Sequence, residues 1–384
     1  MSVPEHVVDL SGRAGPTRWP RGVTLLVGLA AIVAVVAGLR AFASVLGPVV
    51  LALVLVVVVH PVRTRLQRVR WLPGWVGHVV VLLLLYGVLL GAGAAAAWSV
   101  YQLAATLPGY APRFAQLQID GLRLLQQVGI GQSQISQALA SVDTGRVVGL
   151  AETALMQVGS GLSTLGFLLF LMFFLALDAA VFPRLLAQAT WTHPDIVSAL
   201  VGFAAGTRRF IVVSTVFGAV VAVLDVGVLS WLAVPLPLLW GLWSFLTNYV
   251  ANIGFFLGLA PPALLALLAN GPENALAVVV AYTVLNVVIQ GLVQPSIVGG
   301  AVGLSTTLTF LSVVVWGFAL GAVGALLAVP LSLFVRAVMV DADRSAHWLL
   351  PIIAGNPRGV RLRRPRRWRA DPLPVPEREP VSPE

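Results

Sequence analysis

The chain has 384 residues, of which 58% are hydrophobic and 10% are charged, with a net charge of +9 and no cysteine. A soluble domain has roughly 45–50% apolar and about 25% charged residues, so this composition excludes a soluble globular protein. It also excludes disulfides and cysteine-based catalysis or metal sites. The apolar segments predict an all-α, polytopic integral membrane protein with six to eight membrane segments.

The N-terminal part of the chain is predicted to be a tail followed by a membrane scaffold. Residues 1–22 are polar and form the tail. Residues 23–101 contain three apolar runs, with a basic loop at residues 60–75 after the second run. Each run is close to the ~18–20 apolar residues that a helix needs to cross a bilayer. We therefore interpret residues 23–101 as an N-terminal transmembrane scaffold.

The middle of the chain alternates between amphipathic and apolar segments. Residues 102–157 carry balanced charges, several glutamines and apolar residues at helical spacing, which predicts an extracytoplasmic insert of amphipathic helices. Residues 158–182 are apolar enough for a transmembrane span. Residues 183–209 are predicted to form a cytoplasmic amphipathic helix.

Residues 210–336 are predicted to be a transport core with two similar units. Each unit has one ordinary span, at 210–234 or 274–293, followed by a long apolar run, at 236–269 or 305–336. Both long runs exceed the ~20 residues of one span, so each is either a kinked full crossing or a re-entrant hairpin. Two hairpins would enter from opposite sides and form an inverted repeat, as in secondary transporters.

Arginine clusters indicate the orientation in the membrane. They lie before the first apolar run, after the second, around the segment that follows the fourth, and in the Arg/Pro-rich tail at residues 337–384. Basic residues on alternate connections follow the positive-inside rule, so we expect a multi-pass protein of the inner or plasma membrane with both termini cytoplasmic. The tail has no aromatic stacking pattern, so nucleic acid is not an expected partner, whereas the lipid bilayer is.

The strongest candidates for a binding site are amides and helix breakers inside the apolar runs. Such groups are costly at bilayer depth unless they face a cavity or another helix. Asn286, Gln290 and Gln294 are spaced by four residues, so they share one face if they lie in one helix. That face either makes interhelical hydrogen bonds or lines a solute path. The candidate solute-binding residues are Asn248, Asn252, Gly254, Asn286, Gln290 and Gln294.

Asp225 is an acidic residue within the predicted fifth span. Acids in membrane segments are rare and mark ion or proton pathways, so Asp225 is a candidate for binding a coupling proton or Na⁺. A span starting at Phe210 would place it about 22 Å along the helix, near the outer interface, which leaves a structural or interfacial role open. Histidines lie outside the span centres, and no Walker, Rossmann or nucleophile-elbow motif is present. We therefore expect no enzyme, metal or cofactor.

Four motifs occur in order in the C-terminal half. They are NYVANIG at 248–254, APP at 260–262, QGLVQPSIVGGAVGLS at 290–305 and WGFALGAVGALLAVPL at 316–331. Their order and spacing resemble the autoinducer-2 exporter family of bacterial membrane proteins, and the resemblance covers residues 23–340.

The resemblance implies a secondary transporter that exports a small polar solute or signalling metabolite, with coupling to protons or Na⁺ as a further expectation. It is also compatible with a cation/proton antiporter, and it implies a homo-oligomer. A different class remains open, because residues 102–157 could organise envelope partners in a non-transporting membrane scaffold. A channel is a further alternative.

Overall fold

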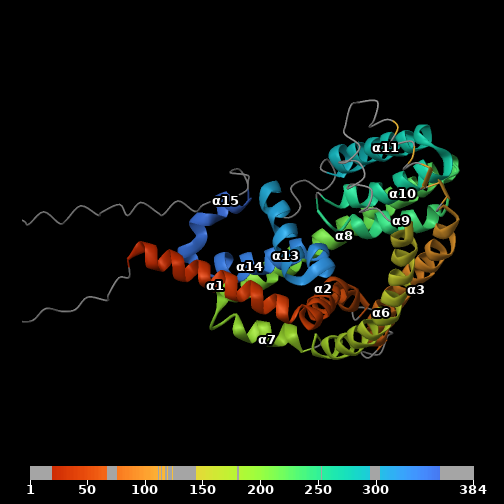
Figure 1. The fold of residues 1–384 in the computed structure, drawn as a ribbon. Helices are drawn as coiled ribbons and strands as arrows, with labels where there is room; N and C mark the ends of the chain where they lie inside the picture. The colour runs from red at the N-terminus through yellow and green to blue at the C-terminus, as the bar shows by residue number, and fades with distance from the viewer. Residues whose placement is uncertain are drawn as a thin grey trace, which may run out of the picture.

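The computed structural model consists of helices throughout the part of the chain that it describes (Figure 1). Five of these helices are long and apolar enough to cross a membrane, and a bent pair at Ser163–Asp178 and Phe182–Ala189 makes a sixth if it counts as one span. The predicted all-α polytopic membrane fold is thereby confirmed. The described residues are 20–66, 76–110, 144–179, 181–251, 253–294 and 303–354, with single positions between 112 and 123.

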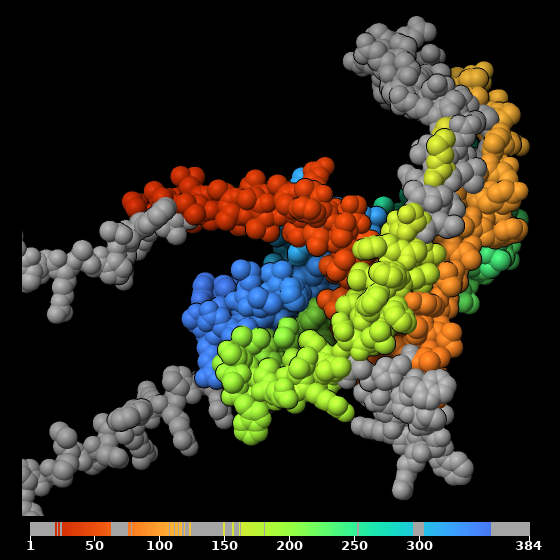
Figure 2. Space-filling model, turned by 90° about the horizontal axis from the view of Figure 1, so that it is seen from below, coloured from red at the N-terminus to blue at the C-terminus, as the bar shows by residue number. Residues whose placement is uncertain are grey.

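Three N-terminal helices form a small bundle that packs against the rest of the molecule through α2. These are α2 (Ala43–Leu66), α3 (Val76–Thr106) and α6 (Thr144–Asp178), and their shared core includes Ala52, Leu85 and Met172. The Tyr86 hydroxyl donates a hydrogen bond of 2.8 Å to the Leu169 carbonyl and ties α3 to α6. Figure 2 shows α3 and α6 as an arm beside the rest of the molecule, with α1 (Arg21–Ala41) extending along another edge.

Two helices are longer than the predicted segments. Helix α6 begins at Thr144, so it joins the end of the predicted insert to the fourth span in one helix. After the short α7 (Phe182–Ala189), helix α8 runs from Pro194 to Trp231 and includes much of the predicted cytoplasmic helix as well as the fifth span. The middle of the predicted insert, residues 124–143, lies outside the described residues.

The first long apolar run folds as a helical hairpin. Helix α9 (Pro237–Thr247) and helix α10 (Gly254–Asn270) are antiparallel, because Trp243 on α9 donates to the Leu257 carbonyl on α10 at 2.7 Å. The Asn270 amide donates to the carbonyls of Leu232 and Ala233, so α10 returns to where α9 begins. Eleven residues of α9 reach only about 16 Å, half of a ~30 Å bilayer core.

The second long run also reverses. Helix α13 (Thr306–Leu326) contains Gly321 at φ 69° and ψ −149°, and helix α14 (Ala328–Arg336) follows. Ser332 on α14 donates to Ser312 on α13 at 2.7 Å and accepts from Trp316 Nε1 at 3.0 Å. Arg336 bonds the Gly303 carbonyl at 2.8 Å, so the run ends beside its own start. Both long runs therefore fold back on themselves, which is the chain path that the hairpin alternative predicts.

The two hairpins enter from opposite ends of α8. The base of the first lies at the C-terminal end of α8, whereas α14 and the π-helical segment Ala337–Asp341 pack along its N-terminal half. The tips meet in the middle, where Val250 packs with Val313 and Ala328. In Figure 1, α9, α10 and α11 (Pro272–Asn286) lie side by side at one end of the molecule, with α13 and α14 towards the other.

The last described residues form short helical segments beside the second hairpin. A 3₁₀ segment at Arg344–Leu349 leads to α15 (Leu350–Ala354), where the Ile353 carbonyl accepts from Ser305 N at 2.8 Å. Arg344 forms an exposed ion pair of 2.9 Å with Asp195 at the start of α8. These contacts hold the C-terminal segment against the N-terminal end of α8.

Candidate functional site

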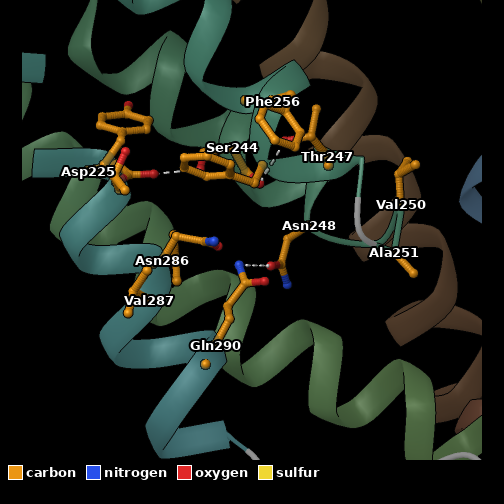
Figure 3. A pocket seen from close by; sticks show the side chains of 17 residues that line it. Asp225, Ser244, Thr247, Asn248, Val250, Ala251, Phe256, Asn286, Val287 and Gln290 are labelled. Atoms are coloured by element: carbon orange, nitrogen blue, oxygen red, sulfur yellow. Dashed lines mark hydrogen bonds between the residues drawn. The ribbon is translucent and has the colours of Figure 1, made fainter. Parts of the chain in front are cut away.

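A cavity of about 480 Å³ lies between α8, the first hairpin and α11 (Figure 3). Its apolar walls include Phe255, Phe256 and Val221. A concave site with apolar walls and a few polar groups is the usual form of a small-molecule site. The polar residues that line it are Asp225, Ser244, Thr247, Asn248, Tyr282, Thr283, Asn286 and Gln290.

Asp225 is contributed by α8 and is 1% exposed. Its Oδ2 accepts a hydrogen bond of 2.5 Å from the Ser244 hydroxyl on α9, as Figure 3 shows, and its Oδ1 has no partner among the described residues. The first hairpin and α11 enclose this part of α8, so Asp225 is buried within the protein. Asp225 is therefore a cavity residue with one bonded and one free carboxylate oxygen.

The tip of the first hairpin is held by Asn248. Its Nδ2 donates to the Ser214 carbonyl on α8 at 2.9 Å, and its Oδ1 accepts from Gln290 Nε2 at 2.8 Å. A Cβ at Gly218 would lie 2.7 Å from the Asn248 amide nitrogen, so the glycine provides the space for this contact. Asn248 thus connects α8 to the segment after α11, and Figure 3 shows its bond with Gln290.

Glycines allow the hairpin to close tightly beneath the cavity. A Cβ at Gly254 would lie 2.0 Å from the Thr247 carbonyl oxygen, and one at Gly258 would lie 3.0 Å from the Thr247 hydroxyl. Small residues let helix backbones approach closely in membrane proteins. Gly254 therefore lines the cavity because its missing side chain brings the two arms of the hairpin together.

A row of polar side chains along α11 and the π-helical segment after it also lines the cavity. Tyr282, Asn286 and Gln290 follow at four-residue spacing and all line the cavity. The Tyr282 hydroxyl and the Asn286 Oδ1 are buried without a hydrogen-bond partner among the described residues. From Val287 to Val293 the helix is a π-helix, which has more residues per turn than an α-helix. The face therefore rotates, and Gln294 does not line the cavity.

Most of the residues singled out from the sequence come together here. Asn248, Gly254, Asn286, Gln290 and Asp225 line one cavity, although they come from α8, from the first hairpin, and from α11 with its π-helical continuation. Asn252 lies outside the described residues, and Gln294 lies just beyond the cavity.

The candidates from the sequence lack four polar lining residues, Ser244, Thr247, Tyr282 and Thr283. Two of them were accessible to the rule that residues four apart share a helix face. Ser244 precedes Asn248 by four positions, and Tyr282 precedes Asn286 by the same interval. Extending each polar face by one turn toward the N-terminus would have found both.

The cavity offers hydroxyls, amides and one carboxyl group. Among the described lining residues, Asp225 is the only acidic or basic side chain, and none carries a positive charge. Amides and hydroxyls both donate and accept hydrogen bonds, so they suit an uncharged polar solute. The carboxyl group adds an affinity for cations, and the set lacks the basic residue that a tightly bound anion requires.

Comparison with known proteins places this geometry in a family. The family model described as AI-2E family transporter matches residues 29–343. The chain is 30% identical to the Escherichia coli K12 AI-2 transport protein TqsA, over 82% of this chain and 91% of that protein. It is 28% identical to the putative transport protein YhhT of the same organism, over 81% and 88%. A putative transport protein of Haemophilus influenzae is 23% identical over 84% and 94%. The chain is a multi-pass membrane protein that belongs to the AI-2E family of transporters.

Proposed function

We propose that this protein is a secondary transporter that moves a small polar solute, uncharged or cationic, through the cavity between α8, the first hairpin and α11. Asn248, Asn286 and Gln290 are the proposed solute-binding side chains. Because Gln290 and Asn248 bond each other at the cavity, the solute takes the place of this bond when it enters.

One observation carries the proposal: the cavity lies against the tip of one of two hairpins that enter from opposite ends of α8. Inverted repeats with interrupted helices near the membrane centre are the common plan of secondary transporters. Buried amides are expensive in a membrane interior unless they serve a solute or another helix. Here one buried amide oxygen, on Asn286, has no hydrogen-bond partner in the part of the chain that the structure describes.

AI-2 is the first solute to test, and export is the proposed direction. Support comes from the similarity to a protein named as an AI-2 transport protein and from the four family motifs in register. We further propose a homo-oligomer in the inner or plasma membrane with both termini cytoplasmic. The alternating arginine clusters support this orientation.

A matched pair of variants tests the solute site. Liposomes that contain the purified protein and are loaded with AI-2 should release it faster than loaded liposomes without protein. Gln290→Leu should abolish this additional release. Gln294→Leu makes the same change one turn further along, outside the cavity, and should keep wild-type flux. Equal flux from both variants would reject the site. Absence of AI-2 flux from the wild type would redirect the search to other small polar solutes.

Cation/proton antiport is a second candidate function, favoured by the buried carboxyl of Asp225. In liposomes, antiport would appear as a change in internal pH when Na⁺ is added outside, without any organic solute. A pH change in the wild type that Asp225→Asn abolishes would favour antiport, whereas AI-2 flux without any cation dependence would exclude it.

A further inference from the structure

The end of the cavity next to α8 contains three buried polar groups from three different elements. Asp225 on α8 and Tyr282 on α11 are 1% and 3% exposed, and Ser244 on α9 is 7% exposed. The Ser244 hydroxyl bonds Asp225 Oδ2, whereas Asp225 Oδ1 and the Tyr282 hydroxyl have no partner among the described residues. Leaving such groups unsatisfied in a membrane interior is unfavourable.

The described surroundings of Asp225 supply no counter-charge. The lining residues from α9, α10 and α11 include no basic side chain, and Tyr282 is the one other titratable group among them. On α8 itself, Arg208 lies about 25 Å away along the helix axis and bonds the Val57 carbonyl. On α14, Arg336 is engaged by Asp341 and the Gly303 carbonyl. A bare carboxylate in this position would be strongly disfavoured.

We propose that Asp225, Ser244 and Tyr282 form a binding site for a monovalent cation, either a proton or Na⁺. This inference rests on the proposed function in one respect: it places the cation subsite in the cavity through which the solute is proposed to move. A proton would bind to Asp225 Oδ1, while Oδ2 keeps its bond from Ser244. Na⁺ would use Oδ1 with the oxygens of Ser244 and Tyr282.

A divalent or transition metal does not suit this group of ligands. Ca²⁺ takes about six to eight oxygens, commonly from several carboxylates, and Zn²⁺ prefers histidine and cysteine nitrogen and sulfur. The described part of the chain contains no group of three His, Asp or Glu side chains that could hold a metal ion. One carboxylate with two hydroxyls balances a single positive charge.

The position of the site connects its occupancy to the first hairpin. Asp225 and Tyr282 belong to helices on either side, whereas Ser244 belongs to α9 within the hairpin. A cation held by all three stabilises the arrangement in which the hairpin lies close to both helices. A ligand shifts a conformational equilibrium only through its different affinities for the two states, and this site provides such a difference.

Thermal unfolding of the purified full-length protein tests the site without any organic solute. Tryptophan fluorescence is followed in NaCl and in choline chloride of equal concentration, at acidic and alkaline pH. If Na⁺ binds, Tm rises in NaCl by at least about 2 °C, most strongly at alkaline pH where protons compete least. If a proton binds, the two salts give the same Tm, and Tm falls as pH rises, because the buried carboxylate loses its neutralising proton.

The variants decide whether Asp225 is responsible. Asp225→Asn, which is nearly isosteric, should remove whichever dependence the wild type shows, whereas Asp178→Asn at the exposed end of α6 should retain it. Should Asp225→Asn fail to fold, Ser244→Ala and Tyr282→Phe each remove one oxygen and should reduce the dependence. A cation dependence unchanged in these variants, or no dependence in the wild type, would overturn the site. AI-2 flux is measured separately, so either proposal can fail alone.

Discussion

Gln290 donates a hydrogen bond of 2.8 Å to Asn248, and this bond joins the helix after α11 to the tip of the first hairpin. Asn248 makes a second bond, to the Ser214 carbonyl on α8, whereas no second bond is described for Gln290. The two side chains therefore have unequal importance: Asn248 joins the hairpin tip to two other elements, whereas Gln290 makes one of those two bonds.

Asn248→Ala should destabilise the protein more than Gln290→Ala does. The first change removes two interhelical hydrogen bonds and the second removes one, at about 0.6 kcal/mol per bond in membrane proteins. The double variant should be no less stable than Asn248→Ala alone, because the shared bond is already lost. Unfolding of the four proteins in a mild detergent with increasing denaturant measures this. Additive losses would show that Gln290 and Asn248 act independently.

Gly254→Ala should destabilise the first hairpin by about 1–3 kcal/mol, the range for overpacked sites. The added methyl group would lie 2.0 Å from the Thr247 carbonyl, so the two arms must separate. Gly227→Ala is the matched control within α8, because nothing lies within 4 Å of its added methyl group. The control should be neutral or slightly stabilising, since alanine favours helix more than glycine does. Equal thermal stability of both variants would contradict the close packing at the tip.

Gly321→Ala should also destabilise, by about 1–3 kcal/mol, for a different reason. Its φ of 69° and ψ of −149° form a conformation open mainly to glycine, although space for a methyl group is available. Gly321→Asn should therefore be about as costly as Gly321→Ala, because ψ −149° lies outside the left-handed helical region that asparagine tolerates. A thermal melt of the two variants checks this, and a wild-type melting temperature for either would contradict the reversal at Gly321.

Cysteine labelling in this cysteine-free chain should place the bases of the two hairpins on opposite sides of the membrane. Cysteines at Ala233 and Glu273 flank the first hairpin, and cysteines at Thr306 and Met339 flank the second. A membrane-impermeant maleimide applied to sealed, oriented vesicles should label the first pair from one side and the second pair from the other. Labelling of Ala233→Cys and Glu273→Cys from different sides would mean that the first long run crosses the bilayer.

The sequence was sufficient for the fold class and for the location of the interruptions. Composition and segment length determine that the chain is helical and membrane-embedded, and the amides and the glycine from Asn248 to Gly254 mark where the first long run breaks. Hairpin and kinked crossing remained equivalent, because both use the same number of apolar residues. What distinguishes them is long-range contact, such as the Asn270 amide on the Leu232 carbonyl, which local patterns do not encode.

Two site assignments depended on geometry that periodicity cannot supply. Gln294 was grouped with Gln290 on the assumption of a uniform α-helix, and the π-helical turn rotates it off that face. Nothing in the local pattern indicated that Asp225 is buried, because the first hairpin and α11, which come later in the chain, enclose this part of α8. The sequence around Asp225 does not reveal that a segment later in the chain covers it.

The aliphatic contact between the two hairpin tips, made by Val250, Val313 and Ala328, differs in kind from the bonds around the cavity. Dispersion forces between such side chains have no preferred direction, so this surface tolerates sideways displacement without losing a specific partner. Directional bonds such as those of Asp225 and Gln290 permit only particular positions. The first hairpin therefore has a non-directional apolar contact at its tip, and directional hydrogen bonds that fix its position on the side of the cavity.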